Sequence, residues 1–293
     1  MPRRCSRVVV LALIAVVTVL SGCTAVPQVV EPVTVTGALG VEPTLAFDTP
    51  LSVASARIEV IAEGTGPEVQ PGTAVLVDYY AESGLDGELI GETYSAAPRA
   101  YLLTVDSVGQ DIYRALDGQK VGARILQVLP ATDSGPPTVA VFDILPTRAV
   151  GEEVEPREGL PTVTLDANGA PMIAVPAEEA STELIAQPLI RGGGPQIEAG
   201  QIITVQYTGV TWTSGTVFDS TWSDDKLPAA FPIGVGSVPA GWDEGLVEQT
   251  VGSQVLLVLP PGSGYGGTDN ELADETLVFV VDILAATGGP GVE

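Results

Sequence analysis

The chain has 293 residues, and its 37 acidic residues outnumber its 12 basic ones to give a formal charge of −25. This length suffices for two domains with separate cores, and a surface of this charge repels nucleic acid and anionic lipid headgroups. Histidine is absent, and the two cysteines, Cys5 and Cys23, both lie near the N-terminus. We therefore expect no cofactor, no metal site and no Ser-His-Asp triad, so any reaction must proceed without strong acid–base, thiol or zinc chemistry.

Residues 1–22 predict a secretory signal peptide. Three arginines lie within the first seven residues, and an apolar run over residues 8–20 follows them. A run of this length is typical of a signal and is too short to span a bilayer comfortably. The mature protein is therefore expected outside the cytoplasm.

The signal ends in Leu20-Ser21-Gly22-Cys23, which resembles the bacterial lipobox, whose cysteine is lipid-modified and becomes the first residue of the mature protein. The alternative is an ordinary signal peptide with an incidental cysteine. The resemblance implies lipidation of Cys23 and a protein held on the extracytoplasmic side of the cell membrane, since each buried acyl methylene contributes about 0.8 kcal/mol. Residues 23–40 are rich in Val, Pro and Thr and are expected to form a semi-extended tether.

The chain repeats itself with a period near 130 residues. Residues 75–79 parallel 203–207 at an offset of 128, and the offset rises to 139 where residues 143–145 parallel 282–284. The rise indicates a longer loop in the second copy. A period this long with two copies predicts tandem domains and not a solenoid.

A polar, acidic segment separates the two copies and reads as a linker. The predicted organisation has six parts: a signal peptide at 1–22, a tether at 23–40, a first domain at 41–148, a linker at 149–159, a second domain at 160–286 and a tail at 287–293.

The second copy has clear strand signals and one helix signal. Strands are predicted over residues 203–207, 255–259 and 277–284, from alternating or continuous apolar residues. A short helix is expected around residues 242–249, because Trp242 and Leu246 lie four apart on one face. The predicted class is α+β, with an antiparallel sheet curled around a short helix in each copy.

Six fragments of the second copy follow one another between Val205 and Phe279 in a characteristic order. They are Val205-Gln206-Tyr207-Thr208-Gly209, Gly215 with Phe218-Asp219-Ser220, Gly241-Trp242-Asp243-Glu244-Gly245-Leu246, Val251-Gly252-Ser253, Pro260-Pro261 with Gly264-Tyr265-Gly266, and Thr276-Leu277-Val278-Phe279. Their order and spacing resemble the FKBP family of peptidyl-prolyl cis-trans isomerases. The resemblance implies a pocket that takes the proline ring of a substrate.

The resemblance also assigns roles to individual side chains. It places Trp242 at the pocket floor and Asp219 and Tyr265, the catalytic candidates, at the rim. The remaining substrate-binding candidates are Tyr207, Phe218, Phe231, Val238, Pro239, Leu272 and Phe279. Taken singly, each has a plainer explanation: aromatic residues on strands are usually core, and Asp219 or Tyr265 can serve a turn.

Two features of the second copy depart from the family pattern. Pro239 occupies the position of an isoleucine whose N–H binds a ligand carbonyl in the family, and proline has no N–H to donate. The loop over residues 267–275 is short and acidic, with Leu272 its only large apolar residue. That loop borders the pocket in the family, so substrates with basic flanking residues are favoured.

The first copy departs further. It retains the wall residues Tyr79 and Tyr101, but the loop that carries Tyr265 is missing. At positions matching Phe218, Asp219 and Trp242 the first copy is predicted to have Thr93, Tyr94 and Ile112. A pocket without its floor and rim is not expected to catalyse, so this copy reads as a degenerate FKBP-like domain.

The resemblance implies a peptidyl-prolyl cis-trans isomerase, active in its C-terminal domain, that assists the folding of extracytoplasmic proteins. Its partners are then proline-containing segments of secreted or membrane proteins, and macrolides are expected as inhibitors. The chemistry suits the composition, because a dry aromatic pocket promotes rotation about an amide bond without proton transfer. The alternative is a noncatalytic lipoprotein that uses two FKBP-like modules to bind or scaffold a partner.

Overall fold

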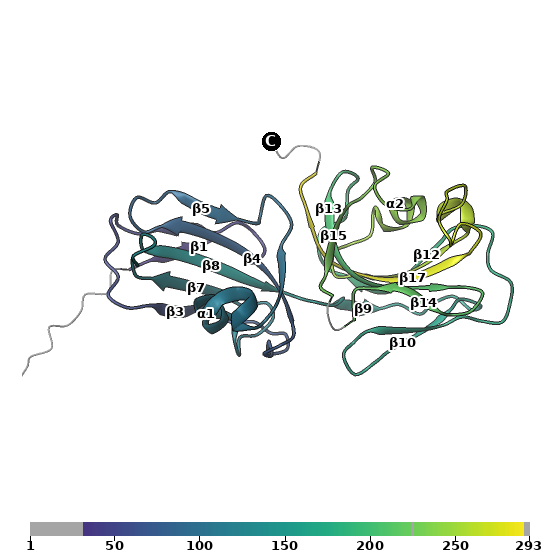
Figure 1. Cartoon of the computed structure of the whole chain (residues 1–293), viewed down its shortest axis with the longest axis horizontal. Helices are drawn as coiled ribbons and strands as arrows, with labels where there is room; N and C mark the ends of the chain where they lie inside the picture. Colours follow the sequence, from purple (N-terminus) through teal and green to yellow (C-terminus); the bar gives the residue numbers. More distant parts are fainter. Residues whose placement is uncertain (1–31, 224–225, 290–293) are drawn as a thin grey trace, which may run out of the picture. The chain divides into compact units, whose positions relative to one another are not determined.

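The computed structural model describes residues 32–223 and 226–289, and within them each copy forms an antiparallel sheet with one short α-helix (Figure 1). The predicted signal peptide, Cys23 and the tether up to residue 31 lie outside the described residues. In the part that is described, no helix is both long and apolar enough to cross a bilayer.

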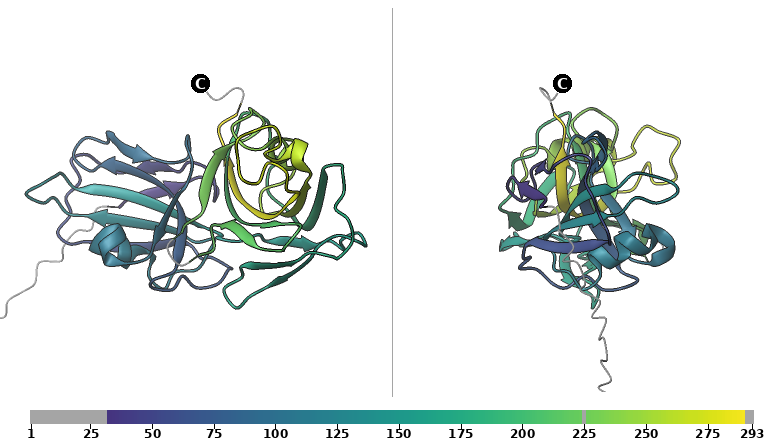
Figure 2. Two further views of the ribbon diagram at one scale, coloured as in Figure 1. Left: turned by 45° about the vertical axis from the view of Figure 1, so that its right-hand side comes forward. Right: turned by 90° about the vertical axis from the view of Figure 1, so that its left-hand side faces the viewer.

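The second domain is built on a seven-stranded sheet in the order β14-β13-β17-β16-β12-β9, with β15 also paired to β13. Figure 2 shows how strongly this sheet curls. Its strands are β9 (Gly151–Glu153), β12 (Ile185–Gly192), β13 (Ile202–Thr211), β14 (Val217–Ser220), β15 (Ala229–Pro232), β16 (Gln254–Leu259) and β17 (Leu277–Thr287). The three predicted strands are therefore confirmed as β13, β16 and β17.

The first domain repeats this topology. Its sheet runs β3-β7-β8-β4-β5 with β6 paired to β4, which matches β12-β16-β17-β13-β14 with β15 paired to β13. The strands are β3 (Arg57–Ala62), β4 (Ala74–Ser83), β5 (Leu89–Glu92), β6 (Arg99–Leu102), β7 (Arg124–Leu129) and β8 (Thr138–Leu145). The internal repeat seen in the sequence is thus a repeat of the whole fold.

A two-stranded hairpin precedes each sheet. In the first domain β1 (Thr34–Thr36) pairs with β2 (Thr44–Ala46), and in the second β10 (Thr162–Leu165) pairs with β11 (Pro171–Ala174). Residues 34–36 therefore belong to the first domain, which corrects the predicted tether over 23–40. The physical reason is burial, because Val35 and Leu45 pack against apolar residues of the sheet.

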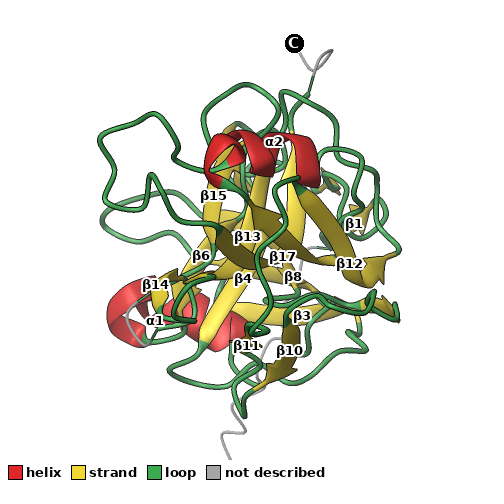
Figure 3. Cartoon of the chain, turned by 90° about the vertical axis from the view of Figure 1, so that its right-hand side faces the viewer, coloured by secondary structure: helices red, strands yellow, loops and turns green. Residues whose placement is uncertain are grey.

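The second sheet is covered on both faces, because α2 (Ala240–Leu246) lies over one face and the β10–β11 hairpin lies over the other (Figures 1 and 3). Residues that alternate along its strands fall into two separate cores. Trp242 belongs to the core on the α2 side, whereas Val278 and Val280 belong to the core under the hairpin. The polar residues of β13 are buried as well, with Thr204 2% and Gln206 5% exposed.

The helix α2 is shorter and starts earlier than the predicted 242–249. Its end is set by Val247, whose backbone is extended, and by Glu248, whose φ is 70°. Beyond the helix, the backbone of Glu248 and Gln249 bonds to that of Ile197, which donates to the carbonyl of Gln249 and accepts from the N–H of Glu248. The counterpart in the first domain is α1 (Val105–Leu116), interrupted at Gly109.

The predicted linker over 149–159 is also partly ordered. Within it, β9 pairs with the end of β12 and extends the second sheet. Just before β9, Ala149 donates its N–H to the carboxylate of Asp282, 2.9 Å away, and Val150 donates to the carbonyl of Gly252. These residues therefore belong to the second domain and not to a linker, because strand pairing and hydrogen bonds to Gly252 and Asp282 hold them.

Candidate functional site

A small cavity of about 90 Å³ opens between α2 and the curled sheet of the second domain. Nine of the ten side chains predicted to form the site line it: Tyr207, Phe218, Asp219, Phe231, Val238, Pro239, Trp242, Tyr265 and Phe279. They come from four strands, from the start of α2 and from the loop after β16. Topology thus brings together residues that are 72 positions apart, from Tyr207 to Phe279.

Trp242 forms the base of the cavity and is 4% exposed. Two glycines bring the helix that carries Trp242 close to β16: a Cβ at Gly241 would lie 2.5 Å from Leu259, and one at Gly245 would lie 2.6 Å from Leu257. Because neither glycine has a side chain, α2 lies directly against β16. The indole Nε1 is buried without a hydrogen-bond partner among the described residues.

Aromatic rings surround Trp242 in edge-to-face contacts. The ring of Tyr207 lies 5.2 Å from the indole, that of Phe279 lies 5.3 Å away and that of Phe231 lies 5.8 Å away, with interplanar angles of 80–90°. Such contacts add stability beyond simple burial. They hold the cavity walls in fixed orientations before any ligand arrives.

Phe218 completes the wall through a close approach at Gly209. A Cβ at Gly209 would lie 2.7 Å from the ring of Phe218 and 2.8 Å from that of Phe279. The missing side chain lets these two rings pack edge to face, 5.4 Å apart. Any larger residue at position 209 would displace a wall of the cavity.

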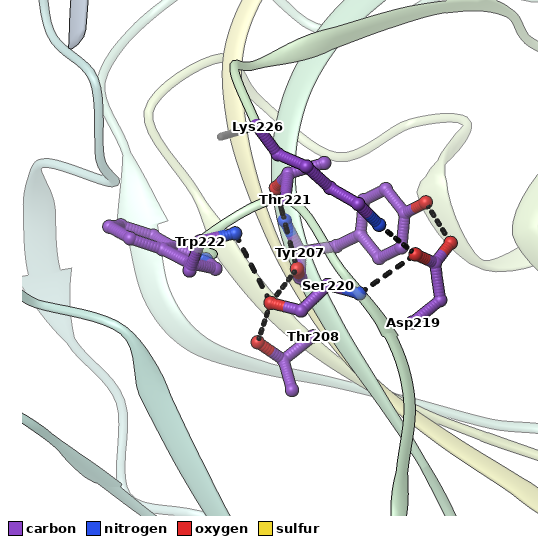
Figure 4. Close-up of polar contacts among 7 residues, drawn as sticks. All are labelled: Tyr207, Thr208, Asp219, Ser220, Thr221, Trp222 and Lys226. Atoms are coloured by element: carbon purple, nitrogen blue, oxygen red, sulfur yellow. Dashed lines mark hydrogen bonds and ion pairs between the residues drawn. The ribbon is translucent and has the colours of Figure 1, made fainter. Parts of the chain in front are cut away.

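Among the residues that the structure describes, Asp219 is the only carboxylate that lines the cavity, and three donors hold it (Figure 4). The hydroxyl of Tyr207 donates to Oδ2 at 2.5 Å, while Lys226 Nζ lies 2.6 Å from Oδ1 and the N–H of Ser220 donates to Oδ1 at 2.9 Å. Burial alone would raise the pKa of Asp219, but the hydrogen bonds from Lys226 and Tyr207 outweigh it and lower the pKa. The carboxylate is therefore ionised at neutral pH.

Lys226 was missed by sequence reasoning. It lies in the loop after β14, and half of its side chain is exposed. Its one signal is rarity, because Lys120 is the only other lysine in this acidic chain. Exposed residues in loops follow no hydrophobic periodicity, so the sequence pattern does not predict where their side chains lie.

Tyr265 reaches the cavity from the loop that follows the short 3₁₀ turn η1 (Pro261–Ser263). Burial raises the pKa of its hydroxyl, and the negative charge of Asp219 raises it further. The hydroxyl therefore stays protonated at neutral pH. A protonated phenol at the cavity edge is a hydrogen-bond donor for a ligand carbonyl.

Pro239 sits at the N-terminal cap of α2 with Val238 before it, and both line the cavity. The carbonyl of Pro239 accepts the N–H of Trp242 at 2.8 Å. Position 239 thus faces the cavity without any N–H to offer a ligand.

Leu272 is the predicted site residue that does not line the cavity. Its backbone N–H donates to the side chain of Asn270 at 2.9 Å, and its side chain packs against the apolar core of the second domain. The turn closed by Asn270 holds this part of the acidic loop in place. In the described residues, no group of three or more His, Cys, Asp or Glu side chains is arranged to hold a metal ion.

The strand pairing of the first domain corrects two predicted equivalences. Gly91 on β5 faces Ala81 on β4, just as Asp219 on β14 faces Gly209 on β13. Ile90 and Gly91 therefore match Phe218 and Asp219, in place of the predicted Thr93 and Tyr94.

Thr93 has a different counterpart, which explains the shift. Its hydroxyl oxygen accepts the N–H of Tyr79 at 2.9 Å, and that of Thr221 accepts the N–H of Tyr207 at 2.8 Å. Both threonines close the same turn, so the offset between the copies is still 128 at this point. Matching Thr93 and Tyr94 to Phe218 and Asp219 implied an offset of 125 between the copies, which is three residues too small.

The first domain thus lacks the polar rim of the second. Tyr79 matches Tyr207, but Gly91 supplies no carboxylate, and a Cβ there would lie only 3.3 Å from the hydroxyl of Tyr79. Counted back from the last residues of the two helices, Leu116 and Leu246, Ile112 stands at the position of Trp242. The loop between β7 and β8 spans only residues 130–137, whereas the loop that carries Tyr265 spans residues 260–276.

Comparison with known proteins places this site in a family. The family model for FKBP-type peptidyl-prolyl cis-trans isomerase matches residues 193–284. The "FK506-binding protein" of Streptomyces anulatus is 34% identical over 119 residues, which cover 39% of this chain and 95% of that protein. The "Probable FK506-binding protein" of Corynebacterium glutamicum is 35% identical over 118 residues, covering 40% of this chain and 98% of that protein.

Among solved structures, the three FKBP domains of wheat FKBP73 align with 80% of this chain and 95% of that one, at 18% identity. The TM-score is 0.32, so this likeness carries no argument about the arrangement of the domains. The sequence relatives, matched over nearly their whole length, are decisive. The chain belongs to the family of FKBP-type peptidyl-prolyl cis-trans isomerases.

Proposed function

We propose that the second domain catalyses cis-trans isomerisation of X-Pro bonds in proteins that fold outside the cytoplasmic membrane. The observation that carries the proposal is the cavity of the second domain, in which aromatic rings surround Trp242 while Asp219 and Tyr265 supply the polar edge. At about 90 Å³ it is far smaller than the roughly 300–1,000 Å³ of pockets that enclose a whole ligand. It suits one ring of a chain whose remainder stays outside.

The mechanism requires no bond to form or break. Rotation about an X-Pro amide has a barrier of about 18–20 kcal/mol because twisting interrupts amide resonance. Water stabilises the polar planar amide more than the twisted form, so an apolar cavity lowers the barrier by excluding water. The cavity of the second domain supplies that environment through its rings.

The two polar side chains then have distinct tasks. Tyr265, kept protonated by burial and by the charge of Asp219, donates a hydrogen bond to the substrate carbonyl. Asp219, ionised and fixed by Tyr207 and Lys226, faces the partial positive charge of the rotating centre. Neither residue exchanges a proton with the substrate.

The proposed location rests on the N-terminal sequence, which lies outside the described residues. A lipid on Cys23 would tether the protein to the outer side of the cell membrane, where secreted and membrane proteins emerge unfolded. The proposed partners are their proline-containing segments, and macrolides are the proposed inhibitors. Replacing Cys23 by Ser should abolish labelling by a radioactive fatty acid, and equal labelling of both forms would exclude the anchor.

Pro239 and the altered first domain favour a second candidate function, a noncatalytic scaffold. A missing N–H costs a ligand one hydrogen bond, worth about 0.5–1.5 kcal/mol. The first domain, with Gly91 and Ile112 at two key positions, is proposed to be degenerate in either case.

A protease-coupled assay with X-Pro peptides distinguishes the two functions. Under the leading proposal the chain without its signal peptide accelerates isomerisation, and a macrolide suppresses the acceleration. A folded protein that binds macrolide but leaves the rate at that of buffer alone would establish the scaffold.

A further inference from the structure

The loop between β15 and α2, residues 233–239, leads directly into one wall of the cavity. Ile233 at its start is fully buried, and Val238 at its end lines the cavity together with Pro239. Between these two ends, residues 234–238 form no backbone–backbone hydrogen bond within the described part of the chain. The loop therefore needs another source of order.

Asp243 supplies that order from the first turn of α2. The N–H of Gly234 donates to Oδ1 at 2.6 Å, and the N–H of Gly236 donates to Oδ2 at 2.7 Å. Both glycines have positive φ, 74° and 77°, a conformation that directs both N–H groups toward one carboxylate and that other residues rarely adopt. The two oxygens thus clamp two points of one loop.

We propose that Asp243 is a positioning residue of the second domain, which holds the wall formed by Val238 and Pro239 at the distance from Trp242 that the proline ring requires. This proposal rests on the function proposed above and adds a determinant of substrate affinity. Asp243 does not line the cavity, so it acts on the ligand only through the loop.

The first domain shows the alternative arrangement. Its helix begins earlier, at Val105, and Thr104 caps it by accepting the N–H of Ser107 at 3.2 Å. The counterpart of Asp243 there is Tyr113, which has no carboxylate. The segment before Gly109 is thus a helical turn with its own cap, and within the described residues no carboxylate accepts a hydrogen bond from its backbone.

Glu244 provides a matched control. It is the neighbouring acid in the same helix, and the structure shows no hydrogen bond to its side chain within the described residues. Loss of either acid removes one negative charge near the start of α2, where charge interacts with the helix dipole. Only loss of Asp243 also releases the loop.

The test compares the Asp243→Asn and Glu244→Gln variants of the chain without its signal peptide. Asn keeps one acceptor oxygen, so the domain should fold with unchanged near-UV circular dichroism. The wall contacts the ring in ground and transition states alike, so D243N should raise KM about tenfold with kcat within about twofold. E244Q should leave both constants unchanged, and equal effects of the two variants would overturn the proposal.

A second measurement works without a variant and without activity. In the native protein the amide protons of Gly234 and Gly236 should exchange with solvent at least about tenfold more slowly than that of Gly262, whose surroundings are open. Fast exchange of both would overturn the clamp even if D243N failed to fold. If the native protein proves inactive, slow exchange still supports the clamp, and failure of the proposed function remains distinguishable.

Discussion

Asp219 is held from three directions, and this arrangement decides what it can do. A carboxylate that accepts bonds from Tyr207, Lys226 and the N–H of Ser220 has little freedom to turn toward other partners. It also has a lowered pKa, which makes it a poor proton acceptor. Its contribution to catalysis is therefore expected to be electrostatic.

The first prediction concerns the two polar residues of the rim. Asp219→Ala and Tyr265→Phe should each lower kcat/KM about 3- to 10-fold, because each removes one hydrogen bond or charge worth about 0.5–1.5 kcal/mol. Tyr101→Phe in the first domain is the control and should change nothing. Loss of the near-UV signal in either rim variant would mean that the residue is structural instead.

The second prediction concerns pH. Because Asp219 has a lowered pKa, kcat/KM should stay constant between about pH 5 and pH 8 and fall only in stronger acid. The Lys226→Met variant loses a hydrogen bond that opposes the effect of burial on Asp219. The pKa of Asp219 therefore rises, and the fall of kcat/KM in acid should begin at a higher pH. Lys120→Met controls for the loss of charge, and superimposable profiles of the two variants would refute the role of Lys226.

At the scale of elements, the hairpins matter as much as the helices. The β10–β11 hairpin precedes the region matched by the family model, which starts at residue 193. It nevertheless covers Val210, Leu256, Val278 and Val280, none of them more than 1% exposed. A domain cut at residue 193 would expose this second core to water.

The third prediction tests that cover. Ile173 on β11 packs against the sheet, whereas its neighbour Met172 is 53% exposed. Ile173→Asp should lower the free energy of unfolding by about 2–4 kcal/mol, and Met172→Asp should change it by less than about 0.5 kcal/mol. Urea unfolding measures both, and equal values would mean that the hairpin does not seal the core.

The fourth prediction concerns Asp282, a carboxylate that is 2% exposed and has no cation bonded to it in the described residues. Burial raises its pKa, although bonds from Ala149 and Gln254 partly oppose the rise. The folded state therefore binds the proton more tightly than the unfolded state. Its contribution to stability is largest below the unfolded pKa of about 3.9 and falls as the pH rises through the folded pKa.

Asp282→Asn should remove this dependence at little cost in hydrogen bonds: the amide oxygen accepts the N–H of Ala149, and the amide nitrogen donates to Gln254 once the Gln254 amide, which donates to Asp282 in the native protein, turns its oxygen toward it. Urea midpoints measured across the acidic range should show native stability declining, relative to D282N, as the pH rises. A constant difference at all pH values would contradict the assignment. Asp269→Asn on the exposed loop is the control.

Much of this architecture was predictable from the sequence, for physical reasons. Long strands such as β13 and β17 carry a strong apolar pattern, and the short helix is signalled by Trp242 and Leu246, which lie four apart on one face. The hairpin strand β1 has three residues, too few for a period, so residues 34–36 were assigned to the tether. Lys226 escaped prediction because nothing in its local sequence fixes an exposed side chain.

At the scale of the whole molecule, the two domains share one strand order and differ at the positions that form the cavity of the second domain. A feature that both domains share is a buried aspartate, Asp143 in β8 and Asp282 in β17, which occupy the same position in their sheets. In the first domain Asp143 is paired with Arg124 at 2.6 Å, and Arg124 also donates to the carbonyls of Gly37 and Val41. Breaking a buried pair of this kind by removing a single partner costs about 3–5 kcal/mol, because the other charge is left buried and unpaired.

The central claim is that catalysis belongs to the second domain alone, and isolated domains test it most directly. A chain of residues 149–289, which keeps β9 and both cores, should accelerate X-Pro isomerisation about as well as the chain without its signal peptide. A chain of residues 32–148 should leave the rate at that of buffer. A folded 149–289 chain with no activity, or an active 32–148 chain, would contradict the account.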